Sequence, residues 1–193
     1  MSGTKAELRT ALLAARRGVS PREHDTEAQA LVQHLPALVA GAETVCAYVP
    51  VGPEPGSIEL IDALHRRRIR VLLPVARSDA EGNPQPLQWG EYRPGELVEA
   101  RFGLREPAEP RLGTDAVAQA SVILVPALAV DRAGVRLGRG AGFYDRSLPL
   151  ADPAARLVAV VRDDELVDLL PAEPHDVRMT HALTPRGGLV ALA

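Results

Sequence analysis

Apolar and polar positions along the chain change their spacing several times. Across residues 4–17, leucines recur at helical spacing and no helix breaker interrupts them, which predicts a first helix. The sequence Ser20-Pro21-Arg22-Glu23 is typical of a helix start, because a capping serine precedes a first-turn proline and a glutamate three residues after the cap. We expect this second helix to end or kink at Pro36, since proline breaks the helical hydrogen bonding.

Short apolar runs bounded by proline, glycine or polar residues predict four buried strands. These runs are residues 44–49, 69–75, 121–125 and 157–161. Helical patterns lie between several of them, and Ser57 is expected to cap one such helix. Buried strands that alternate with helices are typical of α/β proteins. We therefore predict a three-layer αβα sandwich around a central, mostly parallel sheet, in a single domain spanning residues 1–193.

Residues 77–110 depart from this pattern because they contain five prolines. Within them, residues 87–89 predict a short edge strand. We interpret the whole segment as an excursion from the sheet and not as a linker, because apolar side chains can anchor it to the core. The candidate anchors are Trp89, Leu97, Phe102 and Leu104.

Bulk composition excludes several classes of function. The 22 Lys and Arg residues against 25 Asp and Glu residues give a net charge of −3, which argues against a nucleic-acid partner. The basic run at residues 65–68 is short and lacks interleaved aromatic residues, so we interpret it as a solvated helix end. No apolar run reaches membrane-spanning length and the N-terminus lacks the apolar core of a signal peptide, which predicts a cytoplasmic protein without membrane contact. Cys46 lies in an apolar run and is expected to be a small buried hydrophobe.

Residues 136–148, RLGRGAGFYDRSL, combine three alternating glycines with charged side chains. The spacing is GxGxG, which differs from the GxGxxG dinucleotide fingerprint, and no Gly-Lys-Ser/Thr of a P-loop is present. Glycines let backbone N–H groups approach an anion, and arginines can bind phosphate oxygens in a bidentate way. Residues 143–146 are expected to open a helix, whose N-terminus favours anions. A solvated turn with arginines in surface ion pairs explains the segment as well.

A longer string that includes these glycines carries a family resemblance. Residues 125–145, VPALAVDRAGVRLGRGAGFYD, resemble the signature of the 5-formyltetrahydrofolate cyclo-ligases, also called 5,10-methenyltetrahydrofolate synthetases. The resemblance spans nearly the whole chain. Further agreement comes from Lys5 with Arg9, from Glu54, and from residues 102–107 and 170–176. The sequence departs from the family pattern at Ala127, Val130, Phe143 and Thr180.

The resemblance implies an ATP- and Mg²⁺-dependent ligase that acts on small molecules, a reduced folate and ATP, in one-carbon metabolism. The γ-phosphoryl group would be transferred to the formyl oxygen of 5-formyltetrahydrofolate, and N10 would then displace phosphate to form the 5,10-methenyl bridge. Such phosphoryl transfer depends mainly on positioning and charge neutralisation. We expect a monomer. A catalytically silent homologue that binds folate or nucleotide is the alternative, and it is supported by Phe143, which replaces a usual tyrosine.

The same resemblance implies a set of site residues. ATP would be bound by Lys5, Arg9, Arg136, Leu137, Gly138, Arg139, Gly140, Ala141, Gly142, Phe143 and Tyr144. The folate would be bound by Val49, Glu54, Arg139, Gly140, Gly142 and Phe143. Catalysis would involve Arg136, Arg139 and Tyr144, and magnesium would be held by Asp145 and Asp176.

The residue types also admit plainer interpretations. These are a solvated helix face for Lys5 and Arg9, a core ring for Tyr144, a helix cap for Asp145, loop carboxylates for Glu54 and Asp176, and core packing for Val49. Asp131 is expected to stabilise the turn before the glycines, and His175 to be structural.

Overall fold

The computed structural model describes residues 3–100, 103–174 and 176–193. Its α-helices are α1 (Lys5–Arg17), α2 (Pro21–Gln33), α3 (Leu35–Leu38), α4 (Ile58–Arg66) and α5 (Phe143–Ser147). Its 3₁₀ helices are η2 (Thr114–Gln119), η3 (Leu148–Leu150) and η4 (Asp163–Glu165). Its strands are β1 (Thr44–Cys46), β2 (Arg70–Val75), β3 (Gln88–Glu91), β4 (Leu97–Glu99), β5 (Arg105–Pro107), β6 (Arg111–Leu112), β7 (Val122–Pro126), β8 (Ala129–Asp131), β9 (Arg136–Leu137), β10 (Arg156–Val160), β11 (Leu166–Val167), β12 (His181–Thr184) and β13 (Gly188–Ala191).

The main sheet has eight strands within the described residues, in the order β13-β12-β10-β7-β1-β2-β3-β6. Strands β12, β10, β7, β1 and β2 are mutually parallel, and Val45 in β1 lies opposite Val71 and Val122. The outer strands β13, β3 and β6 pair antiparallel with their neighbours. All four predicted strands are present in the parallel part, because their apolar runs are buried on both faces. The predicted mostly parallel central sheet is confirmed.

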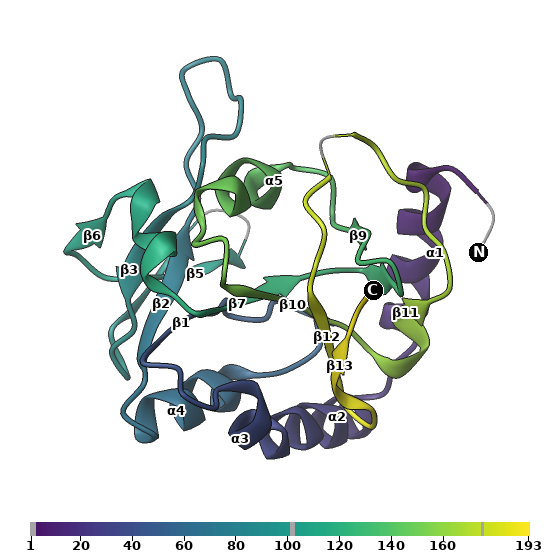
Figure 1. The fold of residues 1–193 in the computed structure, drawn as a ribbon, viewed down its shortest axis with the longest axis horizontal. Coiled ribbons are helices and arrows are strands. Elements are labelled where there is room, and N and C mark those ends of the chain that lie inside the picture. The colour runs from purple at the N-terminus through teal and green to yellow at the C-terminus, as the bar shows by residue number, and fades with distance from the viewer. Residues whose placement is uncertain (1–2, 101–102, 175) are drawn as a thin grey trace.

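Helices cover both faces of this sheet, as the predicted three-layer arrangement requires (Figure 1). On one face, α2, α3 and α4 bury Leu31, Leu35, Leu38, Ile61 and Leu64. On the other face, α5, η2 and η3 pack Phe143, Val117 and Leu148 against the sheet. Cys46 lies fully buried on this second face, and burial raises the pKa of its thiol, which confirms that it is a small hydrophobe.

Local signals set the helix starts. The Thr4 side chain accepts from the N–H of Glu7, whose carboxylate accepts from the N–H of Thr4, which forms a complete capping box for α1. Ser20 accepts from the N–H of Glu23 and starts α2 as predicted. Ser57 stands at the N-cap position of α4 but makes no capping hydrogen bond. The basic run at residues 65–68 is exposed at the end of α4, as expected for a solvated helix end.

The strand predicted at residues 87–89 is present as β3, but the prediction that it lies at the sheet edge is wrong. Strand β3 lies between β2 and the short strand β6, with Gly90 opposite Arg111. Trp89 is 1% exposed and anchors the excursion as expected. Leu97 packs against the main core and Leu104 contributes to a cavity, whereas Phe102 lies outside the described residues.

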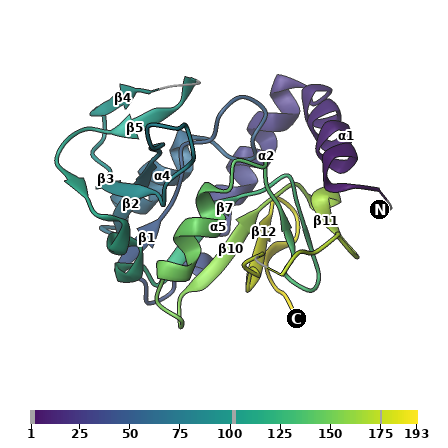
Figure 2. The same cartoon turned by 90° about the horizontal axis from the view of Figure 1, so that it is seen from above.

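Helix α1 does not pack on the main sheet. It lies over a small three-stranded sheet, β11-β8-β9, at one end of the molecule (Figure 2). Leu8 and Leu12 of α1 are buried there against Leu128, Val135 and Leu137. No helix of the described residues is long and apolar enough to cross a lipid bilayer.

Candidate active site

The glycine-rich segment begins at a hairpin formed by β8 and β9. Asp131 is fully buried at its turn and accepts hydrogen bonds from the N–H groups of Ala133 and Val135 with one carboxylate oxygen, and from that of Leu170 with the other. The expected structural role of Asp131 in this turn is confirmed. After β9 the backbone has a positive φ at Gly140 (97°) and Gly142 (78°), a conformation that side chains with a Cβ disfavour.

A cavity of about 240 Å³ lies where β1, β2 and β7 end. The carboxyl ends of parallel strands are the usual place for ligands in α/β proteins. The predicted site residues that line the cavity are Val49, Glu54, Arg136 and residues 138–145. The predicted residues Lys5, Arg9, Leu137 and Asp176 are not among the lining residues, and Leu137 is buried against α1 instead. The structure therefore brings most of the predicted site together around one cavity.

Arg136 is the most buried cation of the glycine-rich segment, with a side chain that is 6% exposed. Its Nη2 donates to Oδ1 of Asp145 at 2.6 Å, and its guanidinium carbon lies 5.7 Å from the centre of the Tyr144 ring. Arg136 Nε and the Tyr144 hydroxyl are buried and have no hydrogen-bond partner within the described residues. Burial also raises the pKa of Tyr144. Two buried polar groups without partners in the cavity wall are typical of a site that a polar ligand completes.

An ion pair joins the two sides of the cavity. Arg139 Nε lies 3.1 Å from Oε1 of Glu54, in the loop between β1 and α4. The other carboxylate oxygen of Glu54 accepts from the N–H of Val51 at 2.9 Å, which fixes its orientation. Arg139 is half exposed, whereas the Glu54 side chain is 12% exposed. A ligand that binds Arg139 from the solvent side can therefore compete for it with Glu54.

Two cations of α1, Lys5 and Arg9, lie outside the cavity. Arg9 Nε donates to the carbonyl of Gly138 at 2.9 Å, and a Cβ at Gly140 would lie 3.4 Å from the Arg9 guanidinium carbon. Lys5 Nζ binds Glu173 at 2.6 Å and Asp176 at 2.9 Å. Partial burial alone would lower the pKa of Lys5, but the hydrogen bonds to the two carboxylates raise it. A Cβ at Gly140 would make only ordinary van der Waals contact with Arg9, so it is the positive φ that favours glycine at this position.

Comparisons with known proteins identify the family of the chain. The family model described as the 5-formyltetrahydrofolate cyclo-ligase family matches residues 1–185. The chain belongs to this family. A relative from Mycolicibacterium smegmatis named 5-formyltetrahydrofolate cyclo-ligase is 62% identical, with 98% of this chain and 97% of the relative aligned. A relative of the same name from Escherichia coli K12 is 31% identical over 88% of this chain and 94% of its own length. The NMR structure of Aquifex aeolicus 5,10-methenyltetrahydrofolate synthetase superposes with a TM-score of 0.79 at 25% identity, over 97% of this chain and 92% of that one.

The two carboxylates assigned to a metal by resemblance to the cyclo-ligases have different surroundings. Asp145 is 29% exposed and lines the cavity, so its free oxygen can face a cation bound there. The Asp176 carboxylate binds Lys5 and the N–H of Glu173. The described residues contain no group of three or more His, Cys, Asp or Glu side chains suited to a metal. Mg²⁺ usually takes only one or two carboxylates together with phosphate and water oxygens, and Asp145 fits such a site.

Sequence reasoning missed several residues that line this cavity. Arg16 and Tyr48 form part of its buried wall, and strand β5 contributes Arg105 and Glu106. Arg16 does carry a signal, because it follows Leu8 and Leu12 on the apolar face of α1, where an arginine is unexpected. The others lie in segments without a distinctive pattern. His175 lies outside the described residues.

Proposed function

We propose that the protein converts 5-formyltetrahydrofolate to 5,10-methenyltetrahydrofolate, with ATP and Mg²⁺, and releases ADP and phosphate. Membership of the cyclo-ligase family supports the reaction class. The observation that carries the proposal is the arrangement of Arg136 Nε and the Tyr144 hydroxyl, which lie beside Asp145 in one cavity wall, buried and without a hydrogen-bond partner among the described residues. Cytoplasmic location, a monomeric state and the absence of other partners stay predictions.

The chemistry needs a better leaving group on the formyl carbon. The formyl oxygen attacks the γ-phosphorus of ATP, and the bond from that phosphorus to the ADP oxygen breaks. The N10 lone pair then attacks the formyl carbon, the carbon–oxygen bond breaks, and inorganic phosphate leaves as N10 loses its proton. Charge accumulates on oxygen in both steps, so donors held in a site with little water stabilise it.

Residues of the glycine-rich segment are suited to the phosphoryl step. Arg136 is oriented by Asp145 and keeps Nε for a ligand oxygen, while the Tyr144 hydroxyl supplies a second donor. Arg139 is exposed enough to meet the triphosphate, and Arg9 lies against the backbone of the same segment. Mg²⁺ bound through Asp145 would neutralise phosphate charge.

Glu54 is suited to the folate side of the reaction. Its carboxylate is held by the N–H of Val51 and faces the cavity. When the triphosphate recruits Arg139, the Glu54 oxygen that pairs with it becomes available to the N10 amine. Val49 and Phe143 add apolar surface to the wall of the same cavity.

The methenyl chromophore tests the proposal directly. Protein incubated with 5-formyltetrahydrofolate, ATP and Mg²⁺ should develop near-ultraviolet absorption and release one ADP and one phosphate for each product formed. The Asp145→Asn variant serves as the matched control and should show little product. Bound folate and nucleotide without product in the wild-type protein would instead support the catalytically silent alternative, for which Phe143 is the supporting departure from the family pattern.

A further inference from the structure

Arg16 is a third cation on the face of α1 that carries Lys5 and Arg9. At about 100° per residue, the three side chains leave the helix within about 40° of one another. Their surroundings differ, because Lys5 and Arg9 lie outside the cavity while Arg16 forms part of its wall with a side chain that is 1% exposed. The other buried wall residues are Tyr48, Leu87, Glu106, Ala127, Leu128 and Arg136, and Arg16 is the least exposed charged residue of the wall.

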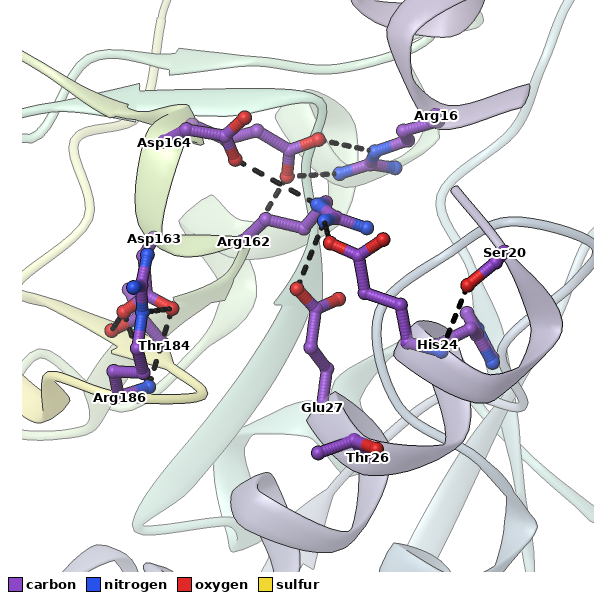
Figure 3. Close-up of polar contacts among 12 residues, drawn as sticks. Arg16, Ser20, His24, Thr26, Glu27, Arg162, Asp163, Asp164, Thr184 and Arg186 are labelled. Atoms are coloured by element: carbon purple, nitrogen blue, oxygen red, sulfur yellow. Dashed lines mark hydrogen bonds and ion pairs between the residues drawn. The ribbon is translucent and has the colours of Figure 1, made fainter. Parts of the chain in front are cut away.

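The Arg16 side chain is held by three hydrogen bonds. Nε and Nη2 donate to the two carboxylate oxygens of Glu165 at 2.6 and 2.7 Å, and Nη2 also donates to the carbonyl of Ala127 at 2.6 Å. Figure 3 shows Arg16 at the end of α1, in a set of polar contacts that joins α1, α2 and η4. These bonds use Nε and Nη2, so Nη1 is the guanidinium nitrogen without a partner within the described part of the chain.

The charge of this pair indicates what kind of group it would bind. Glu165 neutralises Arg16, and both side chains are buried. A phosphate placed beside a neutral buried pair would lose its hydration without gaining a compensating charge. A carbonyl oxygen needs only an N–H donor, which Nη1 supplies. Arg139, which also lines the cavity but is half exposed, suits an anion better.

We propose that Arg16, held by Glu165, selects the head group of the substrate by donating from Nη1 to its ring carbonyl. The proposal rests on the proposed function, under which the ligand is a folate whose pterin ring has a carbonyl at position 4. Arg16 is then a specificity-determining residue in the cavity wall and has no part in phosphoryl transfer.

A pair of ligands that differ at this position tests the proposal. Direct binding is measured for 5-formyltetrahydrofolate and for its 4-amino-4-deoxy counterpart, in which an amino donor replaces the carbonyl acceptor. The wild-type protein should bind the 4-oxo compound about 10- to 100-fold more tightly, the range expected for one buried hydrogen bond to a charged group. A ratio near one in the wild-type protein would overturn the proposal without any variant.

Two variants connect the ratio to Arg16. Arg16→Lys keeps the charge opposite Glu165 but lacks the second guanidinium donor, and Arg16→Met with Glu165→Met replaces the pair with apolar side chains of similar size. Both should reduce the ratio to within about 3-fold while the Kd of a non-hydrolysable ATP analogue stays unchanged, since the hydrogen bonds of Arg16 in the described residues go to Glu165 and Ala127 and not to a predicted nucleotide residue. If either folded variant keeps the wild-type ratio, the proposal is wrong.

Arg162→Met is the matched control. Arg162 belongs to the same set of contacts, where it pairs with Glu23 and Glu27, but it is not a wall residue of the cavity (Figure 3). Its loss should lower stability and leave the ratio of the two folates unchanged. A similar drop in the ratio here would show that the effect is structural and would overturn the assignment to Arg16. Absence of both folate binding and methenyl formation in the wild-type protein would overturn the proposed function itself.

Discussion

Replacing Tyr144 with phenylalanine should stabilise the free protein while it impairs the reaction. The Tyr144 hydroxyl is buried and has no hydrogen-bond partner within the described residues. A buried polar group without a partner costs about 1–3 kcal/mol of folding free energy, and removing one oxygen leaves only a small void. We therefore expect Tyr144→Phe to raise the free energy of unfolding by about 1 kcal/mol, which is about 2–4 °C in Tm for a chain of this length.

Tyr92 provides the matched control within the same protein. It is also buried, but its hydroxyl donates to a carboxylate oxygen of Asp62. Tyr92→Phe removes the same atom and leaves Asp62 without its donor, so the free energy of unfolding should fall by about 1–2 kcal/mol. The two substitutions are chemically identical, and the opposite signs arise from the presence or absence of a partner.

Urea unfolding without ligands measures both changes, and the methenyl assay measures turnover. Under the proposed function, Tyr144→Phe should lower turnover about 100-fold, as for the loss of one donor to developing charge, while Tyr92→Phe should leave it near the wild-type value. If Tyr144→Phe destabilises the free protein as much as Tyr92→Phe, the hydroxyl has a partner and the reasoning fails. If it stabilises the protein and turnover is unchanged, the hydroxyl is not part of the reaction.

Three further changes follow from the same structure. Asp145→Asn should lower turnover about 100-fold with an unchanged circular dichroism spectrum. If the variant keeps the wild-type turnover, Asp145 is not part of the metal site. Gly142→Ala and Gly41→Ala both place an alanine at a positive φ, so each should lower the free energy of unfolding, measured by thermal unfolding, by about 1–2 kcal/mol. Only the Cβ at position 142 would collide with Arg146, so only Gly142→Ala should also reduce activity. Hydrogen bonds lower the pKa of Asp163 from its usual 3.8 despite partial burial, so Asp163→Asn should lower the free energy of unfolding at neutral pH. The difference in free energy of unfolding between the wild-type protein and the variant, measured by urea unfolding, should disappear as the pH falls through the lowered pKa. A difference that does not depend on pH would contradict this.

Much of the fold could be predicted because its signals are local. The first two helices begin where Thr4 and Ser20 cap them, and the central strands coincide with apolar runs. Strand β6 and the small sheet β11-β8-β9 could not be predicted, since several of their strands are only two residues long and carry no periodic pattern. The edge-strand prediction failed for this reason, because β3 has a partner that the sequence does not reveal.

The candidate site was likewise predictable only where its residues are neighbours in the sequence. The glycine-rich segment is continuous in sequence, so its residues could be proposed as a group, and the structure places residues 138–145 around one cavity. Contacts between distant segments were not predictable. Arg16 and Glu165 are 149 positions apart, and neither Arg139 nor Glu54 indicates its partner through spacing. The position of Arg16 on an apolar helix face indicated burial, but not the carboxylate that makes burial tolerable.

The distribution of charge around the cavity implies an orientation for the substrates. Under the proposed function, the half-exposed Arg139 and the nearby Arg9 favour the triphosphate, whereas the neutral Arg16–Glu165 pair favours an uncharged ring. A folate with its ring at Arg16 would then extend along a wall that Arg136 and Tyr144 also line. This arrangement also gives a reason why α1 carries Arg9 and Arg16 on one face in different environments. A single helix fixes the distance between Arg9, beside the proposed phosphate site, and Arg16, at the proposed ring site. A change at Arg16 should therefore alter folate selection and leave nucleotide affinity unaltered, and an equal loss of affinity for both ligands would contradict this orientation.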